Sequence, residues 1–292
     1  MSMTLLFTIL TLCLIGIFAA IILYIIAQKF KVEEDPRIDA VEEVLPSANC
    51  GACGYPGCRA FAEACIKADS LEGLFCVPGG NECMAQVAHL LGHEAVAQDP
   101  KIAVVRCNGT VENRAHVTQY DGVKTCAICA QTYSGETACA YGCLGLGDCE
   151  TVCPFDAIHI DVKTQLPVVD EDKCTACGKC VTACPKQIIE LRKRGPKGRR
   201  VWISCINHDK GGAARKACQA ACIGCGKCVK ECPFDAIVLE NNLAYIDFEK
   251  CKLCRKCVAV CPTGAIHEIH FPPRPVKSQE TTGGPSTAVS EG

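Results

Sequence analysis

The longest continuous apolar stretch of the chain lies at its start. Residues 4–27 carry no charge and are almost wholly apolar. A helix needs about 20 apolar residues to span the hydrocarbon core of a membrane. A cleaved signal peptide is disfavoured, because no basic residue precedes the run and the run exceeds the usual apolar core of such peptides. The pattern therefore predicts a transmembrane anchor over residues 1–28.

Basic residues follow this run at once, at Lys29 and Lys31. Positive charge beside a membrane helix favours the cytoplasmic side, so we expect a single-pass protein of the inner (cytoplasmic) membrane with all later domains in the cytoplasm. One span cannot form an ion channel, and any ion transport would need other subunits.

Beyond residue 100 the apolar positions come in short runs that predict strands rather than long helices. Four Cys-Pro pairs are each followed by a predicted helical turn and a strand, and the pattern of residues 102–190 recurs over 201–269. The fold class is therefore α+β, with two tandem modules. The predicted strands lie within residues 102–110, 155–162, 166–174, 186–193, 201–209, 234–241, 243–251 and 263–270.

A cysteine phrase, C-x2-C-x2-C-x3-C-Pro, occurs three times in full and once with a substitution. This is the bacterial ferredoxin run that binds 4Fe–4S clusters. The complete copies are Cys174, Cys177, Cys180 and Cys184; Cys222, Cys225, Cys228 and Cys232; and Cys251, Cys254, Cys257 and Cys261. The fourth copy ends at Cys149 and Cys153 but has Leu146 where its second cysteine should be.

The spacing predicts which cysteines share a cluster. The first three thiolates of a phrase wrap one cubane, and the fourth binds the other cluster of the pair. We therefore expect Cys261 to complete the set that begins at Cys222, Cys232 the set that begins at Cys251, and Cys153 the set that begins at Cys174. Zinc needs no third cysteine at this spacing, and disulfides need an oxidising compartment.

The substituted phrase lacks one thiolate. Cys143, Cys149 and Cys184 remain for this centre, which is either 3Fe–4S or completed by another cysteine. Cys139 is nearest in sequence, and we predict it as the fourth ligand. Five further cysteines have no assigned role and include enough thiols for a sixth cluster, although each also fits a small buried hydrophobe: Cys107, Cys126, Cys129, Cys205 and Cys218.

A different cysteine pattern lies nearer the anchor. Cys50, Cys53 and Cys58 read C-x2-C-x4-C, and Cys76 follows. Glycines between them permit close approach of the backbone to a cluster, so we expect a 4Fe–4S site, with zinc as the alternative. Residues 59–68 have helical periodicity, which places Cys65 in the core.

Composition agrees with a protein held together by clusters. It has 28 cysteines and only 5% aromatic residues, so clusters replace much of a hydrophobic core. A net charge of −2 gives no reason to expect a nucleic-acid partner. The basic joint at 192–200 is either a solvated hairpin or a docking patch for an acidic redox partner. We expect an anchor (1–28), a 4Fe–4S domain (29–100), two ferredoxin-like modules (101–198 and 199–270) and a disordered tail (271–292).

At NCGACGYPGC followed by FCVPGG, the chain resembles the B-subunit family of the Rnf complexes, membrane-bound ferredoxin:NAD⁺ oxidoreductases that translocate Na⁺ or H⁺. The resemblance covers the anchor, the small domain and the ferredoxin modules, and the two tandem modules resemble the longer form found in anaerobes. It implies that Cys50, Cys53, Cys58 and Cys76 are ligands in the small domain.

The resemblance also implies an oxidoreductase subunit that takes electrons from soluble ferredoxin and passes them to other subunits. The chain has no G-x-G-x-x-G fingerprint and no phosphate loop, so no catalytic residue is assigned and hydride chemistry belongs to a partner. At least five clusters are expected. The alternative is the iron–sulfur wire of another membrane oxidoreductase, such as a hydrogenase or a formate-oxidising complex.

Overall fold

A computed structural model describes residues 3–29 and 35–273 of the chain. It divides into two compact units, residues 1–96 and 97–292, which are described separately. Most of the predicted disordered tail lies outside the described residues, because the description ends at residue 273.

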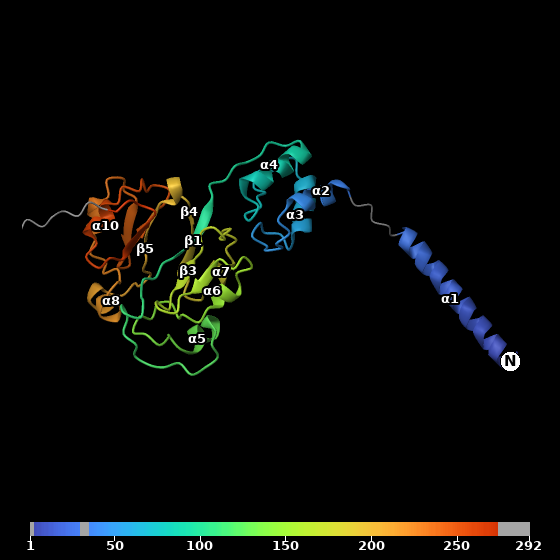
Figure 1. The fold of residues 1–292 in the computed structure, drawn as a ribbon, viewed down its shortest axis with the longest axis horizontal. Helices are drawn as coiled ribbons and strands as arrows, with labels where there is room; N and C mark the ends of the chain where they lie inside the picture. The colour runs from blue at the N-terminus through green and yellow to red at the C-terminus, as the bar shows by residue number, and fades with distance from the viewer. Residues whose placement is uncertain (1–2, 30–34, 274–292) are drawn as a thin grey trace, which may run out of the picture. The chain divides into compact units, whose positions relative to one another are not determined.

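The first unit is helical. Its long N-terminal helix is uninterrupted (Figure 1) and contains an apolar segment, Leu6–Ile26, that is long and apolar enough to cross a membrane. This helix occupies the predicted anchor. The helices of the unit are α1 (Met3–Lys29), α2 (Arg37–Val44), α3 (Cys58–Lys67) and α4 (Gly80–Leu91).

Three of these helices enclose a small core. Val41 of α2, Phe61 of α3 and Val87 of α4 are almost wholly buried and belong to one apolar cluster. The helix predicted over 59–68 is confirmed as α3, and Cys65 lies in this core as expected. The loop between α2 and α3, which contains Cys50 and Cys53, packs against this core.

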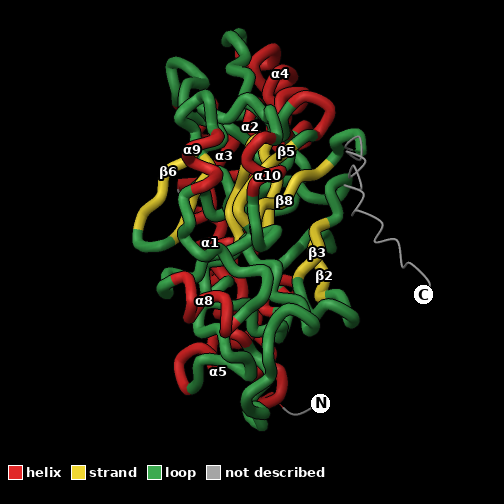
Figure 2. The backbone as a smooth tube through the Cα atoms, turned by 90° about the vertical axis from the view of Figure 1, so that its left-hand side faces the viewer, coloured by secondary structure: helices red, strands yellow, loops and turns green. Residues whose placement is uncertain are grey.

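Over its described residues, 97–273, the second unit contains eight short strands in four antiparallel pairs. One outer pair and one inner hairpin form in each half of the unit: β1 with β4 and β2 with β3, then β5 with β8 and β6 with β7. In the second half, β5 lies beside β8 in Figure 2, where strands are yellow. The strands are β1 (Lys101–Val105), β2 (Ile158–Ile160), β3 (Pro167–Val169), β4 (Ile189–Lys193), β5 (Arg200–Ile203), β6 (Ile237–Glu240), β7 (Leu243–Ile246) and β8 (Ile266–Ile269).

All eight predicted strands are confirmed, but the predicted helical turns lie elsewhere. The residues after each Cys-Pro form plain turns, and a helix of four or five residues lies before the cysteine instead. Proline restricts the residue that precedes it, so each helix ends before the Cys-Pro pair. The helices are α5 (Cys126–Thr132), α6 (Asp148–Thr151), α7 (Lys179–Ala183), the 3₁₀ turn η1 (Pro196–Gly198), α8 (Gly211–Ala217), α9 (Lys227–Glu231) and α10 (Lys256–Val260).

The basic joint between the halves is not a solvated hairpin. Arg192 and Arg200 are 1% and 4% exposed, and they pair with Glu190 and Glu171. The Arg192 guanidinium lies over the ring of Tyr245, 5.2 Å from its centroid. These arginines are therefore part of the packing between the two halves, and only the tip around Lys197 is exposed.

Candidate metal centres

All four cysteine phrases have the same local backbone. A residue with left-handed φ comes directly before a short helix in each, at Gly147, Gly178, Gly226 and Arg255. This turn sets the second and third positions of the phrase on one loop, and glycine adopts it without the cost that a side chain brings. The substituted phrase thus keeps its loop and lacks only the thiol.

In the second half, one pocket is lined by Cys222, Cys225, Cys228 and Cys261. These are the four cysteines that the crossed assignment predicts together. The pocket contains about 360 Å³ of space, open mouth included. Burial, followed by the charges of the other three thiols, raises the pKa of Cys228 to about 11.

The neighbouring predicted sets also lie together, as their electrostatic interactions show. Burial, followed by the charges of the Cys174, Cys177 and Cys153 thiols, raises the pKa of Cys180 to about 12. In the second half, burial raises the pKa of Cys251, and the thiols of Cys254 and Cys232 add to this shift.

Cys257 belongs with this last group. Burial, followed by the charges of the Cys251 and Cys254 thiols, raises its pKa to about 12. The structure therefore brings together the four cysteines predicted for each of these two centres.

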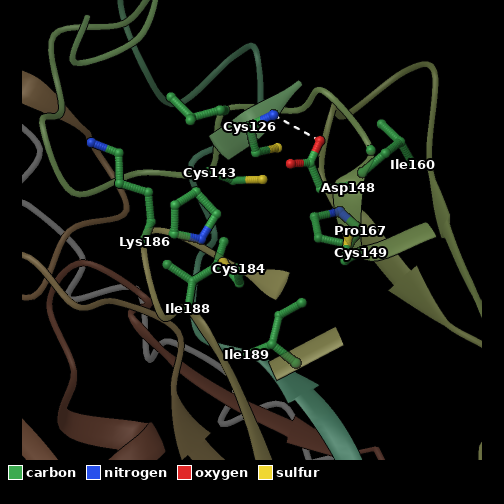
Figure 3. Close-up of a pocket in the computed structure, with 13 residues that line it drawn as sticks. Cys126, Cys143, Asp148, Cys149, Ile160, Pro167, Cys184, Lys186, Ile188 and Ile189 are labelled. Carbon is green, nitrogen blue, oxygen red and sulfur yellow. Dashed lines mark hydrogen bonds between the residues drawn. The ribbon is translucent and has the colours of Figure 1, made fainter. Parts of the chain in front are cut away.

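At the substituted phrase the structure differs from the prediction. Its pocket is lined by Cys143, Cys149 and Cys184, and the fourth thiol is that of Cys126 (Figure 3). Cys139 does not line this pocket. Burial, followed by the charges of neighbouring thiols of which Cys126 contributes most, raises the pKa of Cys149 to about 12.

A carboxylate places Cys126 at this corner. The N–H groups of Cys126 and Ala127 donate to the two oxygens of Asp148, at 2.7 and 2.9 Å (Figure 3, dashed line for Cys126). Asp148 lies at the start of α6 and immediately before Cys149, so it ties the first residue of α5 to the cysteine loop. The free N–H groups at a helix start favour such an anion.

In the first unit, Cys50, Cys53, Cys58 and Cys76 line one pocket of about 320 Å³. Asn49 shapes the entry, because its Oδ1 accepts from the N–H of Cys58 at 2.8 Å. Cys83, which the spacing did not single out, hydrogen-bonds to Cys76, and this bond raises the pKa of Cys76 and lowers that of Cys83. Cys83 does not line the pocket.

A further pocket collects four of the remaining cysteines. Cys107, Cys139, Cys205 and Cys218 line it, together with Arg114 and Asn207. The predicted ligand Cys139 thus lies in a four-thiol site, but not in the one beside Leu146. Sequence spacing missed this set because its members are far apart along the chain, and it missed Cys126 because 22 residues separate that cysteine from Cys149.

The donor sets fit iron–sulfur clusters better than single ions. Within residues 3–29 and 35–273, no three His, Cys, Asp or Glu side chains are arranged to hold one metal ion. Zinc with bonds of about 2.3 Å to sulfur needs thiols nearly in contact, whereas a cubane needs a wider cage. Four thiols around each of four pockets of 320–360 Å³ match that need. Cluster binding would release the protons of these thiols.

Models of known protein families match three regions of the chain. A 4Fe-4S dicluster domain matches residues 173–236 and 221–265. A putative Fe-S cluster domain matches residues 45–71, and the Fe-S cluster-binding domain of the LdpA family matches residues 148–194. Iron–sulfur binding domains are therefore present in both units.

Several curated proteins are similar over most of the chain. The B subunit of the Na⁺-translocating ferredoxin:NAD⁺ oxidoreductase complex of Acetobacterium woodii is 48% identical over 82% of this chain and 72% of that protein. The B subunit of the proton-translocating ferredoxin:NAD⁺ oxidoreductase complex of Clostridium ljungdahlii is 42% identical over 88% and 89%. The B subunit of the ion-translocating oxidoreductase complex of Methanosarcina acetivorans is 39% identical over 87% and 94%.

Proposed function

Because the chain belongs to the B-subunit family of the ion-translocating ferredoxin:NAD⁺ oxidoreductase (Rnf) complexes, we propose that it is the electron-entry subunit of such a complex. In this role it takes electrons from reduced soluble ferredoxin and delivers them to other subunits. The observation that carries the proposal is the grouping of thiols in fours around separate pockets. Bound 4Fe–4S clusters supply one-electron transfer at these places.

The ligand sets of five clusters follow from this grouping. We propose one cluster in a four-cysteine domain of the first unit and two in each half of the second unit, which makes the halves tandem ferredoxin modules. The sets are Cys50, Cys53, Cys58 and Cys76; Cys126, Cys143, Cys149 and Cys184; Cys153, Cys174, Cys177 and Cys180; Cys222, Cys225, Cys228 and Cys261; and Cys232, Cys251, Cys254 and Cys257.

In this role, the backbone around the cysteines positions the ligands and donates hydrogen bonds to their sulfurs. Left-handed turns such as those at Gly147 and Gly226 bring the backbone close to the ligands. Backbone N–H groups donate to sulfur, as from Gly145 to Cys143 at 3.4 Å and from Ala157 to Cys153 at 3.3 Å. Such bonds to the sulfurs help to set the potential of a cluster.

The reduction of NAD⁺ belongs to a partner subunit. That step consumes two electrons and one proton, which two one-electron deliveries from ferredoxin and one proton from solvent supply. The sequence has no dinucleotide fingerprint, so the chain would deliver electrons and not bind the nicotinamide. Its α1 helix would anchor it in the inner membrane, with the chain after this helix in the cytoplasm, as Lys29 and Lys31 favour.

The test uses the full-length protein, purified in detergent without oxygen and reconstituted with iron and sulfide. We expect about 20 irons or more per chain and electron paramagnetic resonance (EPR) signals of reduced 4Fe–4S clusters after mixing with reduced ferredoxin. A protein with iron that dithionite reduces but ferredoxin does not would contradict the entry role. Copurification with hydrogenase or formate-oxidising subunits in place of an NAD⁺-reducing complex would contradict the assignment to this complex.

A further inference from the structure

The loops that carry the first two positions of the four ferredoxin phrases differ in charge. Equivalent stretches, each starting one residue before the first cysteine, are residues 142–148, 173–179, 221–227 and 250–256. The first contains one carboxylate, the second two basic residues and the third one basic residue, with no other charge. The last contains four basic residues and no carboxylate. The strong positive charge is therefore specific to one loop and is not a property of the phrase.

In this last loop the cations lie around an exposed ligand. Cys254, the second cysteine of the phrase, is exposed, and so are Lys252 and Lys256. Lys250 Nζ lies 3.9 Å from Asp247 Oδ2. Lys252 and Lys256 form no ion pair with any residue that the structure describes. Two uncompensated positive charges therefore flank the thiol of this centre that is open to solvent.

The backbone on both sides of Cys254 is in the left-handed region. Leu253 has a φ of 57° and Arg255 a φ of 64°, where the preceding phrase has Gly224 and Gly226. Side chains are disfavoured in this conformation and glycine is not. The Leu253 side chain reaches the basic joint, because a methyl group on Gly195 would lie 2.8 Å from Leu253 Cδ1. The loop is therefore packed against the joint.

Arg255 extends the same surface. It donates to both carboxylate oxygens of Glu268 at 2.7 Å, which compensates that negative charge. The Arg255 guanidinium lies 4.8 Å from the ring centroid of Phe271, and that of Arg199 in the joint lies 5.6 Å from the same centroid. The loop and the joint thus meet at one aromatic ring. The exposed tip of the joint, at Lys197, belongs to this surface.

We propose that the cationic face, defined as Lys197, Lys252 and Lys256 around Cys254, is the docking site for reduced soluble ferredoxin. The charge of the face fits an acidic iron–sulfur protein, because opposite charges steer two redox proteins together and fix their orientation. The proposal rests on the proposed function and adds the place of entry to it.

Docking here would bring the donor to the centre of Cys232, Cys251, Cys254 and Cys257. Each transfer oxidises the ferredoxin by one electron and reduces this centre by one, and no bond forms or breaks. The equivalent loop of the first half offers a weaker site. It has Thr175 where the second half has Lys252, and its Lys173 pairs with Asp156 at 3.2 Å.

The test measures how fast a reduced soluble 2[4Fe–4S] ferredoxin reduces the full-length, reconstituted protein in detergent, by stopped-flow absorbance without oxygen. We expect Lys252→Glu/Lys256→Glu to lower the second-order rate constant about tenfold at low ionic strength. The difference should nearly vanish at about 1 M salt, where the screening length is about 3 Å. Iron content and reduction by dithionite should match the wild type, because all cysteines are kept.

A matched pair separates the local effect from the change in total charge. Lys256 and Lys179 each lie two residues after the second cysteine of their phrase. We expect Lys256→Glu to slow reduction by ferredoxin about threefold and Lys179→Glu to leave the rate unchanged. Lys197→Glu lies in the joint and away from every ligand, so it keeps the test decisive if a loop variant loses iron. We expect it to slow reduction about threefold as well.

Three results would overturn the docking site. The first is an unchanged rate in Lys252→Glu/Lys256→Glu, or in Lys197→Glu where the loop variants lose iron. The second is equal slowing by Lys256→Glu and Lys179→Glu. The third is an unchanged ferredoxin rate with loss of copurifying subunits, which would assign the face to another subunit. A wild type that ferredoxin does not reduce would instead refute the proposed function itself.

Discussion

The two halves of the second unit complete equivalent pockets in different ways. In the second half, the solvent-facing corner is Cys225, an exposed residue of the phrase itself. In the first half the equivalent position is Leu146, and the corner comes from Cys126 on α5. The loop that bears these positions is the same in both halves, with a left-handed glycine before a short helix.

The difference is explained by an insertion. Between the two cysteines that flank this region, the first half has 31 residues, from Cys107 to Cys139, and the second half has 12, from Cys205 to Cys218. The longer segment contains α5, and Asp148 holds the start of α5 against the cysteine loop. A four-thiol site therefore depends on the positions of its thiols in space, and a consecutive motif is only one way to set them.

We expect the largest loss of iron and of stability when the third cysteine of the ferredoxin phrase in either pocket is replaced. Cys149→Ala and Cys228→Ala each remove a thiol that is only 7% or 8% exposed, and the iron left without its ligand would face the apolar core. We expect each variant to lose about four irons and to melt at a lower temperature. Iron analysis and thermal unfolding check this. Full iron in Cys149→Ala would show that the first-half pocket holds no cluster.

A smaller and more specific effect is expected at the corner that differs. Cys126→Ala and Cys225→Ala each free the iron nearest solvent, so we expect loss of about one iron and an oxidised 3Fe–4S signal in EPR. Cys139→Ala is the informative control. It should leave the centre beside Leu146 unchanged, whereas a 3Fe–4S signal from Cys139→Ala alone would return that corner to Cys139.

The sequence could predict features that repeat at fixed spacing. Eight strands follow from short apolar runs around the phrases, and the ferredoxin spacing groups Cys222, Cys225 and Cys228 with Cys261, as their common pocket does. It could not predict Cys126, because no fixed register links α5 to Cys149 and the link depends on one carboxylate. Proximity in sequence favoured Cys139, but the backbone carries that thiol toward the other half.

The basic joint was misleading for a related reason. A run of arginines and lysines is usually solvated, and composition alone cannot show that Arg192 packs over Tyr245 and Phe248 of the other half. Guanidinium groups stack on aromatic rings and pair with carboxylates when water is excluded. The burial of Arg192 is therefore a property of the contact between the halves.

Loss of this contact should lower the stability of the protein although every cluster-binding cysteine is kept. Arg192→Ala removes a side chain that bonds Glu190 and the carbonyl of Val201. We expect the free energy of unfolding to fall by about 3 kcal/mol, as for a broken buried ion pair. Denaturant titration without oxygen measures it. Lys197→Ala, at the exposed tip of the same joint, should stay within about 0.5 kcal/mol. Equal values for the two variants would mean that the joint is solvated in solution.

We expect the smallest effect from replacing Asp148, the carboxylate that holds α5 against the cysteine loop in the first half only. Asp148→Ala removes both acceptors at the start of α5, those for the N–H groups of Cys126 and Ala127. Loss of such an acceptor costs about 1 kcal/mol, which corresponds to about a fivefold change in an equilibrium constant. We therefore expect a chelator to remove the iron at this corner about five times faster, as followed by the rise of the 3Fe–4S signal.

Thr125→Ala is the matched control for this effect. Thr125 Oγ1 accepts from the N–H of Ile128 at 3.3 Å, so it caps α5 without joining it to the cysteine loop. If attachment of α5 to that loop decides how firmly the corner iron is held, Thr125→Ala should change the rate of iron loss much less than Asp148→Ala. Equal rates in the two variants would mean that the stability of α5 itself matters, and that the carboxylate acts only as a second cap.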